Sequence, residues 1–537
     1  MRLVIPRTDK SGFILPAVLA FIIAISILGG AVLTIILNNF FVVSNNVQSQ
    51  QSFNIAEAGI NYYLWHMAHN GADYKDGGTT PTTPDPTLGY GPYVHNYLDS
   101  NAKIVGTYTL WIKPQGNGST IASVRSIGKA AGSNITRTAQ AQVGAASFAS
   151  YGLVSDTEFW FGANESAGGP IFSNVGIHMD GPNSDLVESA NACYTPGANY
   201  SNGVNTPQNG STCGAGKQNG VWCDSSIISP KCTTRDKSNW LYPKTSVDFN
   251  QVSGSLCTMK KTALADYSST AAIASQANAC SQTPTTRTNA YIPQYSSSGA
   301  FSSTQGYLIQ LNNNGTYDLS KVSGENDRKT TYGAALTTTS VATGIALPPS
   351  GVIFAEDNVW VRTGTGFHGR VSIASGRLAT ASSTDITIVD HMLYSLKDGS
   401  DAIGLIAEKN VLVAPYAPPA TGSFNFEIDA AALAQSGSVT WPLYYDGTTT
   451  CTKGWVAPNQ TFTFYGSVAT RLDWTWNWGS TNSCGDMVKD TTNSIWYSGI
   501  EHTTTSYDYN LQYAPPPSYP VTGSYDILSW REVLTHP

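Results

Sequence analysis

The sequence predicts a mainly β protein carried on a long N-terminal transmembrane and amphipathic α-helix, and three observations indicate this. Of the 537 residues only 12% are charged, whereas 41% are hydrophobic and 50 are glycine, a balance that suits exported β-rich cores. A run without any charged residue begins at Phe13 and is apolar as far as Leu37. Residues 352–361 and 404–413 match as A-E-x-N-V-x-V, which predicts a repeated strand, corner and strand. The length favours two or three structural units over one core.

The first element is a helix expected over residues 13–70. Its apolar part, residues 13–37, spans about 37 Å at the helical rise, enough to cross a hydrocarbon layer and too long for the core of a cleaved secretory signal. Basic residues precede it and are expected to stay on the cytoplasmic side, namely Arg2, Arg7 and Lys10. Apolar residues then recur every three or four positions as far as Trp65, so we expect one continuous helix that ends in "HNGADYKDGG".

Two short motifs in this region resemble those of type IV pilin precursors. The junction Ser11-Gly12-Phe13 joins a short basic leader to the apolar helix, and "FNIAEAGINYYL" at 53–64 is similar to the AEAG segment of PilX-type minor pilins. The resemblance implies a leader over residues 1–12, cut between Gly12 and Phe13 by a prepilin peptidase, and methylation of the new amine. It also implies that the helix lies first in the inner membrane and later in an extracellular filament, with other pilin subunits and the assembly machinery as partners.

One position departs from the pattern of the major pilins. Those proteins carry a glutamate five residues into the mature chain, where this sequence has Ala17 after Pro16. An unpaired ammonium in an apolar environment is costly, so a subunit without this acid is poorly suited to polymerising with itself. The resemblance therefore favours a minor or tip subunit. The alternative is a single-pass surface protein that enters no filament.

The next element is a small β-module over residues 71–147. A loop rich in Gly, Pro, Thr and Asp comes first, and three segments of alternating polar and apolar residues follow it, which predicts short strands. These segments are "GTYTLWIKPQG", "STIASVRSIGKA" and "SNITRTAQAQVGA". They are expected to pack on the end of the helix, as in the small module of pilins that the sequence resembles.

A β-solenoid is expected over residues 148–181 and 346–472. Short strands end in Gly or Asn, and a corner amide on each coil would meet the corner of the next coil, as at Asn174, Asn358 and Asn410. A right-handed parallel β-helix fits best, with a β-sandwich as the alternative. Residues 182–345 are expected to form a cysteine-containing insertion, and residues 473–537 an aromatic and proline-rich C-terminal cap.

Eight cysteines with no C-x2-C spacing favour disulfides in an oxidising compartment over a zinc site. Two of them stand apart from the rest, so we expect a bridge between Cys451 and Cys484. The pairing of the other six stays open, and these are Cys193, Cys213, Cys223, Cys232, Cys257 and Cys280. No metal or other cofactor is expected.

Three further patterns bear on chemistry. "GTGFHG" at 364–369 satisfies G-x-G-x-x-G but precedes no helix, so it is interpreted as a turn. Trp474, Trp476 and Trp478 alternate along one predicted strand, which would form either a structural cap or a strip that stacks on glycans. Carboxylate pairs that a polysaccharide-degrading enzyme would need exist at Asp385 with Asp390 and at Asp398 with Asp401, but their surroundings are those of ordinary rungs and turns. No catalytic residue is assigned.

The sequence thus predicts a non-enzymatic minor pilin, anchored in the cytoplasmic membrane and then displayed on the cell surface. Its β-solenoid would serve adhesion or surface contact, with glycans or the surface of a host or partner cell as candidate contacts. The net charge of −7 without a long basic run argues against nucleic acid as the main partner. The alternative from another class is a membrane-anchored β-helix protein that degrades or binds polysaccharide without a pilus.

Overall fold

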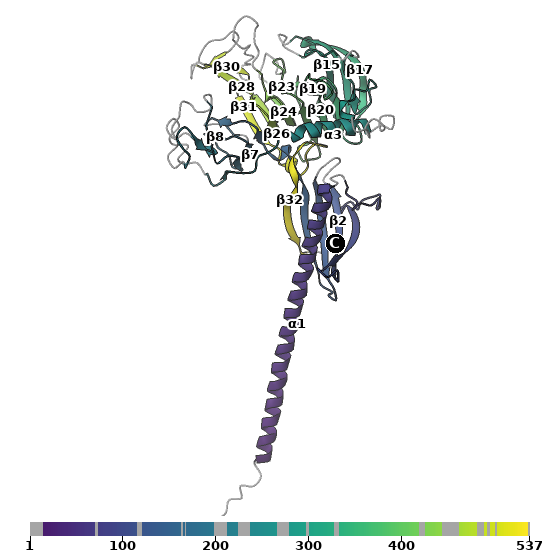
Figure 1. Cartoon of the computed structure of the whole chain (residues 1–537), viewed down its shortest axis with the longest axis vertical. Coiled ribbons are helices and arrows are strands. Elements are labelled where there is room, and N and C mark those ends of the chain that lie inside the picture. Colours follow the sequence, from purple (N-terminus) through teal and green to yellow (C-terminus); the bar gives the residue numbers. More distant parts are fainter. Residues whose placement is uncertain are drawn as a thin grey trace, which may run out of the picture.

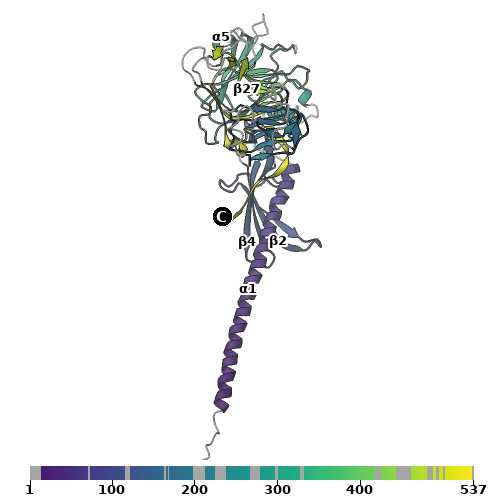
Figure 2. The same cartoon turned by 90° about the vertical axis from the view of Figure 1, so that its left-hand side faces the viewer.

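The computed structural model shows a long helical rod with a small sheet beside its upper part and a large β head beyond it (Figure 1). A view turned by 90° keeps the head at the end of the rod far from residue 14 (Figure 2). The structure describes residues 14–69, 73–114, 121–162, 165–166, 168–197, 212–223, 237–265, 279–296, 300–326, 332–417, 425–442, 461–480, 488–490, 495–499 and 502–534. The predicted mainly β architecture on an N-terminal apolar helix is confirmed.

The rod is the single helix α1 (Ile14–His69), whose two halves have different surroundings. Its buried residues begin at Ser52 and are spaced so that they lie along one face: Ser52, Ile55, Ala56, Gly59, Ile60, Tyr63 and Met67. This face packs on an antiparallel sheet, where it forms a core with Leu110, Val124 and Val143. The sequence between Ile14 and Val47 has no such partner among the described residues.

The small sheet has five strands, in the order β1 (Tyr90–Leu98), β2 (Ile104–Pro114), β3 (Ile121–Ala130), β4 (Thr136–Ser147) and β32 (Val521–Val533). The first four follow one another along the chain, and β2, β3 and β4 correspond to the three predicted strands, whereas β1 lies in the stretch that the sequence predicts as a loop. The fifth comes from the C-terminal region that the sequence predicts as part of a cap, and it pairs with β4. The whole head therefore lies in the chain between two neighbouring strands of the small sheet.

The head is built mainly from parallel strands in two large sheets. The first contains β5 (Leu153–Ser155), β7 (Ile171–Ser173), β9 (Val187–Ser189), β13 (Trp240–Leu241), β14 (Tyr291–Ile292), β18 (Val352–Ala355), β20 (Arg370–Ser375), β22 (Ala402–Ala407), β24 (Asn425–Ala434), β26 (Thr461–Thr470) and β31 (His502–Tyr507). The second contains β15 (Gly306–Leu311), β16 (Thr316–Glu325), β17 (Leu336–Ala346), β19 (Asn358–Thr363), β21 (Ile386–Ile388), β23 (Val411–Val413), β25 (Val439–Thr440) and β27 (Trp474–Thr475).

Smaller elements complete the head. A third parallel sheet contains β6 (Phe159–Phe161), β8 (Ile177–Met179) and β12 (Val221–Trp222). The remaining strands are β10 (Cys193–Tyr194), β11 (Gln218–Asn219), β28 (Asn477–Ser480), β29 (Val488–Asp490) and β30 (Ile495–Gly499). The helices are α3 (Gln251–Ala265), α5 (Tyr332–Ala335), and the 3₁₀ turns η1 (Phe148–Ser150), η2 (Ala279–Ser281) and η3 (Tyr509–Gln512).

Successive coils of the head each place one strand in the first sheet and one in a neighbouring sheet. The predicted repeat pair corresponds to β18 with β19 and to β22 with β23, and one coil, β20 with β21, lies between them. The looser relative at 170–181 forms β7 and β8. Strands β9, β13, β14 and β15 also belong to coils, although they lie within residues 182–345, which the sequence predicts as an insertion. The right-handed sense of the coil stays a prediction.

The order of the coils in space differs from their order in the chain. Leaving the small sheet, the chain enters the middle of the stack, because β5 pairs with β26, the strand of the last coil. It continues to β13 at one end, resumes at β14 at the opposite end, and returns through β18 to β26. The connection between these ends includes α3, which covers the outer face of the first sheet with residues such as Val252, Leu256 and Met259.

The predicted corner amides form a ladder between coils. Asn358 donates from Nδ2 to the backbone oxygens of Ser302 (3.0 Å) and Gln305 (3.1 Å), and its Oδ1 accepts from the backbone N–H of Asp385 at 3.1 Å. Asn410 donates from Nδ2 to Asp385 Oδ1 at 2.9 Å and accepts from the N–H of Ser438 at 2.9 Å. The predicted role of these two corners is confirmed.

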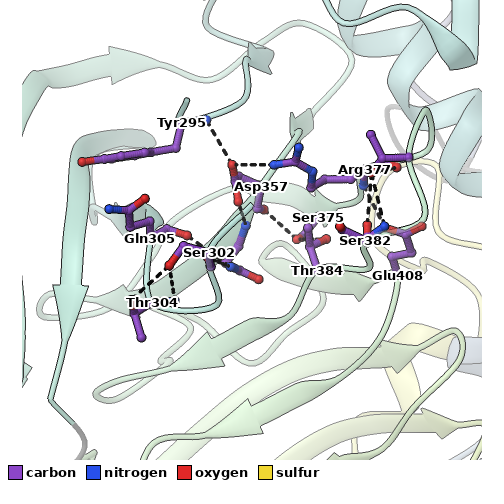
Figure 3. Close-up of polar contacts among 12 residues, drawn as sticks. Tyr295, Ser302, Thr304, Gln305, Asp357, Ser375, Arg377, Ser382, Thr384 and Glu408 are labelled. Atoms are coloured by element: carbon purple, nitrogen blue, oxygen red, sulfur yellow. Dashed lines mark hydrogen bonds and ion pairs between the residues drawn. The ribbon is translucent and has the colours of Figure 1, made fainter. Parts of the chain in front are cut away.

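Charged groups also join neighbouring corners. Arg377 donates from Nη1 to Asp357 at 3.3 Å, and its backbone N–H donates to Glu408 at 2.8 Å (Figure 3). Asp357 also accepts from the backbone N–H of Tyr295 at 3.0 Å. Arg377 and Asp357 are buried, so their mutual contact and the bond from Tyr295 offset the cost of removing these charges from water.

Candidate functional site: the exposed apolar helix

The N-terminal half of α1 presents an apolar surface that the rest of the described chain does not cover. From Ile14 to Val47 its large apolar side chains are 48% to 77% exposed. The most apolar window of the helix has a mean hydropathy of 2.7 with 0% of it buried, and no Asp, Glu, Lys or Arg occurs in the helix before Glu57. Within the described residues, α1 is the helix that is long and apolar enough to cross a membrane.

Between Ile14 and Leu37 the polar side chains, those of Ser26 and Thr34, are satisfied inside the helix. Ser26 donates to the backbone oxygen of Ile22, and Thr34 donates to that of Gly30, both at 2.8 Å. Hydroxyl groups that bond to the preceding turn leave no donor that needs water. The surface is therefore suited to lipid or to packing among other apolar helices.

Close contact holds the other half of α1 on the small sheet. A Cβ placed on Gly128 of β3 would lie 2.1 Å from the backbone oxygen of Ser52 and 2.4 Å from the nitrogen of Ala56. A Cβ on Gly59 would lie 2.3 Å from Ser126 Oγ. Ala56 and Gly59 belong to the A-E-A-G segment, so this motif supplies the small residues that allow helix and sheet to approach.

Hydrogen bonds reinforce this contact at the base of the sheet. Ser52 donates to the backbone oxygen of Ile135 at 2.9 Å and accepts from the N–H of Ala130 at 3.0 Å. Arg137 of β4 donates to Ser49 Oγ of α1 and to Glu532 of β32, both at 2.6 Å. One arginine therefore joins the helix, the fourth strand and the C-terminal strand.

The upper end of α1 is tied to the loop that follows it. His66 Nε2 lies 3.0 Å from Asp73 Oδ2, and His95 Nε2 of β1 lies 2.6 Å from Asp76 Oδ2. Tyr62 donates to Asp76 Oδ1 at 3.0 Å, and burial, followed by the charge of Asp76, raises the pKa of Tyr62 to about 12. His69, three residues further along α1, instead contacts the backbone oxygen of Trp65.

Several predicted site residues lie outside the described part of the chain. These are the processing residues Gly12 and Phe13 and the expected bridge between Cys451 and Cys484. Two of the pairings that the sequence leaves open are defined: Cys193 bonds to Cys213, and Cys257 of α3 bonds to Cys280 of η2.

The predicted tryptophan strip takes a different form. Trp476 is 5% exposed, and its ring packs 5.1 Å and 5.3 Å from those of Phe462 and Phe464 of β26. The ring of Trp474 is turned by 82° relative to Trp476 and packs toward Phe161 of β6. The ring of Trp476 therefore lies in the core where the last coil meets the first, and the half-buried ring of Trp474 packs against that core. The side chain of Trp478 lies outside the described residues.

The candidate carboxylate pairs have structural partners. Asp385 accepts from the N–H and side chain of Asn410 within the corner ladder, and Asp390 lies 3.5 Å from Arg362. Asp398 accepts from Ser400 within its own turn.

Buried Asp401 accepts from the backbone N–H groups of Gly369 (2.8 Å) and Leu396 (2.7 Å), and its Oδ1 also lies 2.9 Å from His368 Nδ1. The "GTGFHG" segment is the connection from β19 to β20.

No group of three or more His, Cys, Asp or Glu side chains that could hold a metal ion occurs in the described ranges.

Comparisons with known proteins were made for the whole chain. No protein-family model matches it, and no curated protein does. A solved structure, the crystal structure of the competence-associated pilin ComZ from Thermus thermophilus, aligns over 91% of this chain and 98% of that chain with 12% identity and a TM-score of 0.25. So low a TM-score does not establish a common fold, and no conclusion about this chain follows from the match.

Proposed function

We propose that the protein is a minor subunit of a type IV pilus, held by α1 and displaying its β head for contact with surfaces. One observation carries this proposal: an exposed apolar helical surface of more than twenty residues continues without a break into the helix that packs on the small sheet. The motifs at residues 11–13 and 53–64, which resemble those of pilin precursors, support the same function.

The geometry of α1 suits both a membrane-embedded subunit and a subunit in a filament. Residues 14–37 extend about 36 Å, which matches a membrane span, and the bare helix goes on for about 15 Å to Val47 before it reaches the sheet. A shaft of this kind can leave the bilayer only if another apolar environment replaces lipid, because exposing so many large side chains to water is costly. A bundle of similar helices in a filament supplies that environment.

The position of the head supports a role in display. Both views place it at the end of α1 opposite the exposed apolar half (Figures 1 and 2). Its chain enters through β4 and leaves through β32, two strands paired in one sheet, so head and shaft are joined twice. A load on the head is then shared by two covalent connections. Non-enzymatic contact is the function we assign to it.

The test uses the full chain expressed in a bacterium that makes type IV pili. The mature protein is purified and its N-terminus is determined by mass spectrometry, while gold-labelled antibodies locate the head. The expected mature chain begins at an N-methylated Phe13, and label follows filaments. Gly12→Val should leave the leader attached, whereas the matched control Ser11→Ala should be processed.

Two outcomes would contradict the proposal. A mature chain that begins downstream of residue 37 would show that the helix is a discarded signal. Correct processing with label on cell bodies and never on filaments would instead favour an anchored surface protein.

A further inference from the structure

The face of the small sheet that points away from α1 carries an ordered set of hydrogen-bond donors. Side chains alternate along strands, so the residues of β3 that pack on the helix, such as Val124 and Ser126, leave Ser123 and Arg125 on the opposite face. On β4 the same alternation leaves Gln140 and Gln142 there, because Ala139, Ala141 and Val143 face the helix.

Strand register arranges these side chains in two rows across the sheet. The first row contains Trp111, Arg125, Gln140 and Arg531, each paired with the next. The second contains Lys113, Ser123, Gln142 and Ser529. Contacts within and between rows orient the amides: Arg531 donates to Gln140 Oε1 at 3.2 Å, and Gln140 donates to Ser123 Oγ at 2.8 Å. Three consecutive strands and the distant strand β32 thus contribute to one surface.

Two adjoining hollows lie over these rows. They have volumes of about 290 and 360 Å³ and share Ser123, Gln140 and Arg531 as lining residues. The second hollow is also lined by Arg125 and Lys113, so three cationic side chains and no acidic one line the pair. Together the hollows form an elongated groove that could accept consecutive units of a chain molecule.

The charges in the groove are crowded. Partial burial is the main cause that lowers the pKa of Arg125, and the nearby charge of Arg531 lowers it further. Two guanidinium groups that repel each other gain when an anion lies between them. Lys113 lies at the edge, where it donates to the backbone oxygen of Pro86 at 3.0 Å.

We propose that this groove, defined by the two rows, binds an acidic polysaccharide through the carboxylates of its uronic acid units. The planar guanidinium groups of Arg125 and Arg531 match a carboxylate with two parallel hydrogen bonds. Gln140, Gln142 and the two serines both donate to and accept from sugar hydroxyls. A uronic acid presents both kinds of group on one ring.

Nucleic acid fits the groove less well. Binding to phosphates requires more clustered cations than the three here, and the chain as a whole carries a net charge of −7. The site goes beyond the proposed pilus function and does not depend on it. It faces away from α1, so the helix of the same chain does not cover it.

The test measures binding of polygalacturonate to the purified full chain in detergent micelles, with neutral dextran, poly-glutamate and single-stranded DNA as comparison probes. Polygalacturonate should bind, dextran should not, and the other two should bind at least tenfold more weakly. Arg531→Gln and Arg125→Gln should each weaken binding of polygalacturonate by about tenfold. Arg125→Lys, which keeps the charge and the packing, should still lower the affinity for polygalacturonate several-fold, because the planar guanidinium group with its two parallel donors is lost.

Lys129→Gln is the matched control, because Lys129 lies on the same strand and face but lines neither hollow. It should change affinity less than twofold. An equal loss in Lys129→Gln would mean diffuse electrostatic attraction and would overturn the site. Absence of polygalacturonate binding, or equal or tighter binding of DNA or poly-glutamate, would overturn the ligand class. Neither result bears on whether the chain enters a filament.

Discussion

The small sheet and the head bury their apolar residues in different ways. In β3 buried and half-exposed residues alternate, so one face packs on α1 and the other meets solvent. In β18 and β22 every residue is buried, because one face lines the coil and the other lies under α3 and neighbouring segments. The small sheet therefore depends on the helix for its core, whereas the head encloses its own.

This difference indicates which contacts limit the stability of each region. The small sheet relies on its packing against a single helix, with the closest approach at Gly128. The head relies on many repeated contacts between coils. We expect its weakest place to be the seam between β5 and β26, where coils distant in sequence meet. The predictions below test this contrast, beginning with the largest effect.

Gly128→Val should separate α1 from the small sheet. The new side chain would overlap backbone atoms of Ser52 and Ala56, which a rotamer change cannot move. We expect a loss of at least about 3 kcal/mol in the stability of the small module, with the head unchanged. Limited proteolysis followed by mass spectrometry would show new cleavage in residues 52–147. Gly523→Ala, also in this sheet but with open space at its Cβ, should have little effect.

Trp476→Ala should open the seam of the head. It removes a buried ring that packs on β26 and on Trp474, which in turn contacts Phe161 of β6, at a cost of about 3 to 5 kcal/mol. Hydrogen exchange should increase in β5 and β26 first, while the small sheet keeps its protection. Trp65→Ala, at a ring that is 59% exposed, is the control. Equal exchange throughout the head would argue against a local seam.

Asn358→Ala should weaken the corner ladder. The change leaves the N–H of Asp385 and two backbone oxygens without the amide that now contacts them. Because unsatisfied buried groups are costly, we expect about 2 kcal/mol less stability in urea unfolding. Asn314→Ala, in the exposed turn between β15 and β16, should cost much less. A similar loss in both variants would contradict the ladder's role.

Acid should affect the two regions in opposite directions. In the head, burial raises the pKa of Asp429 to about 6, although the hydrogen bond from Lys397 acts to lower it. Burial also raises the pKa values of Asp357 and Asp385. A carboxyl whose folded pKa is raised binds protons more tightly in the folded state, so the head should gain stability as pH falls from 7 toward 4. For Asp429 the gain is at most about 3 kcal/mol.

In the small module the sign is reversed for Asp73. Burial opposes its ionisation, but hydrogen bonds from Lys75, His66 and Gly77 leave its pKa below the usual 3.8. The stability it contributes is present above that value and is lost as pH falls through the lowered pKa. Hydrogen exchange of the two regions at pH 7, 5 and 3 would separate these effects, and Asp429→Asn should flatten the response of the head.

Much of the local structure was predictable from particular residues. The uncharged run before Glu57 predicts the long helix, and the matching repeats predict β18, β19, β22 and β23 with Asn corners between them. The groove on the small sheet was missed, although Ser123 with Arg125 and Gln140 with Gln142 show the spacing of two that places polar side chains on one face. The pairing between strands decides which face points away from the helix and which strands lie side by side. The sequence of one strand alone does not reveal that pairing.

The sequence by itself determined the apolar shaft, the alternation of the small sheet and the strand and corner pattern of the coils, because these depend on residues close together in the chain. Only the tertiary structure decided that β32 completes the small sheet and that β5 stacks on β26. It also decided that Trp474 and Trp476 pack at this seam. The physical reason is that backbone hydrogen bonds between strands are nearly independent of side-chain identity. The partner of a strand therefore follows from which arrangement buries the most apolar surface across the whole chain.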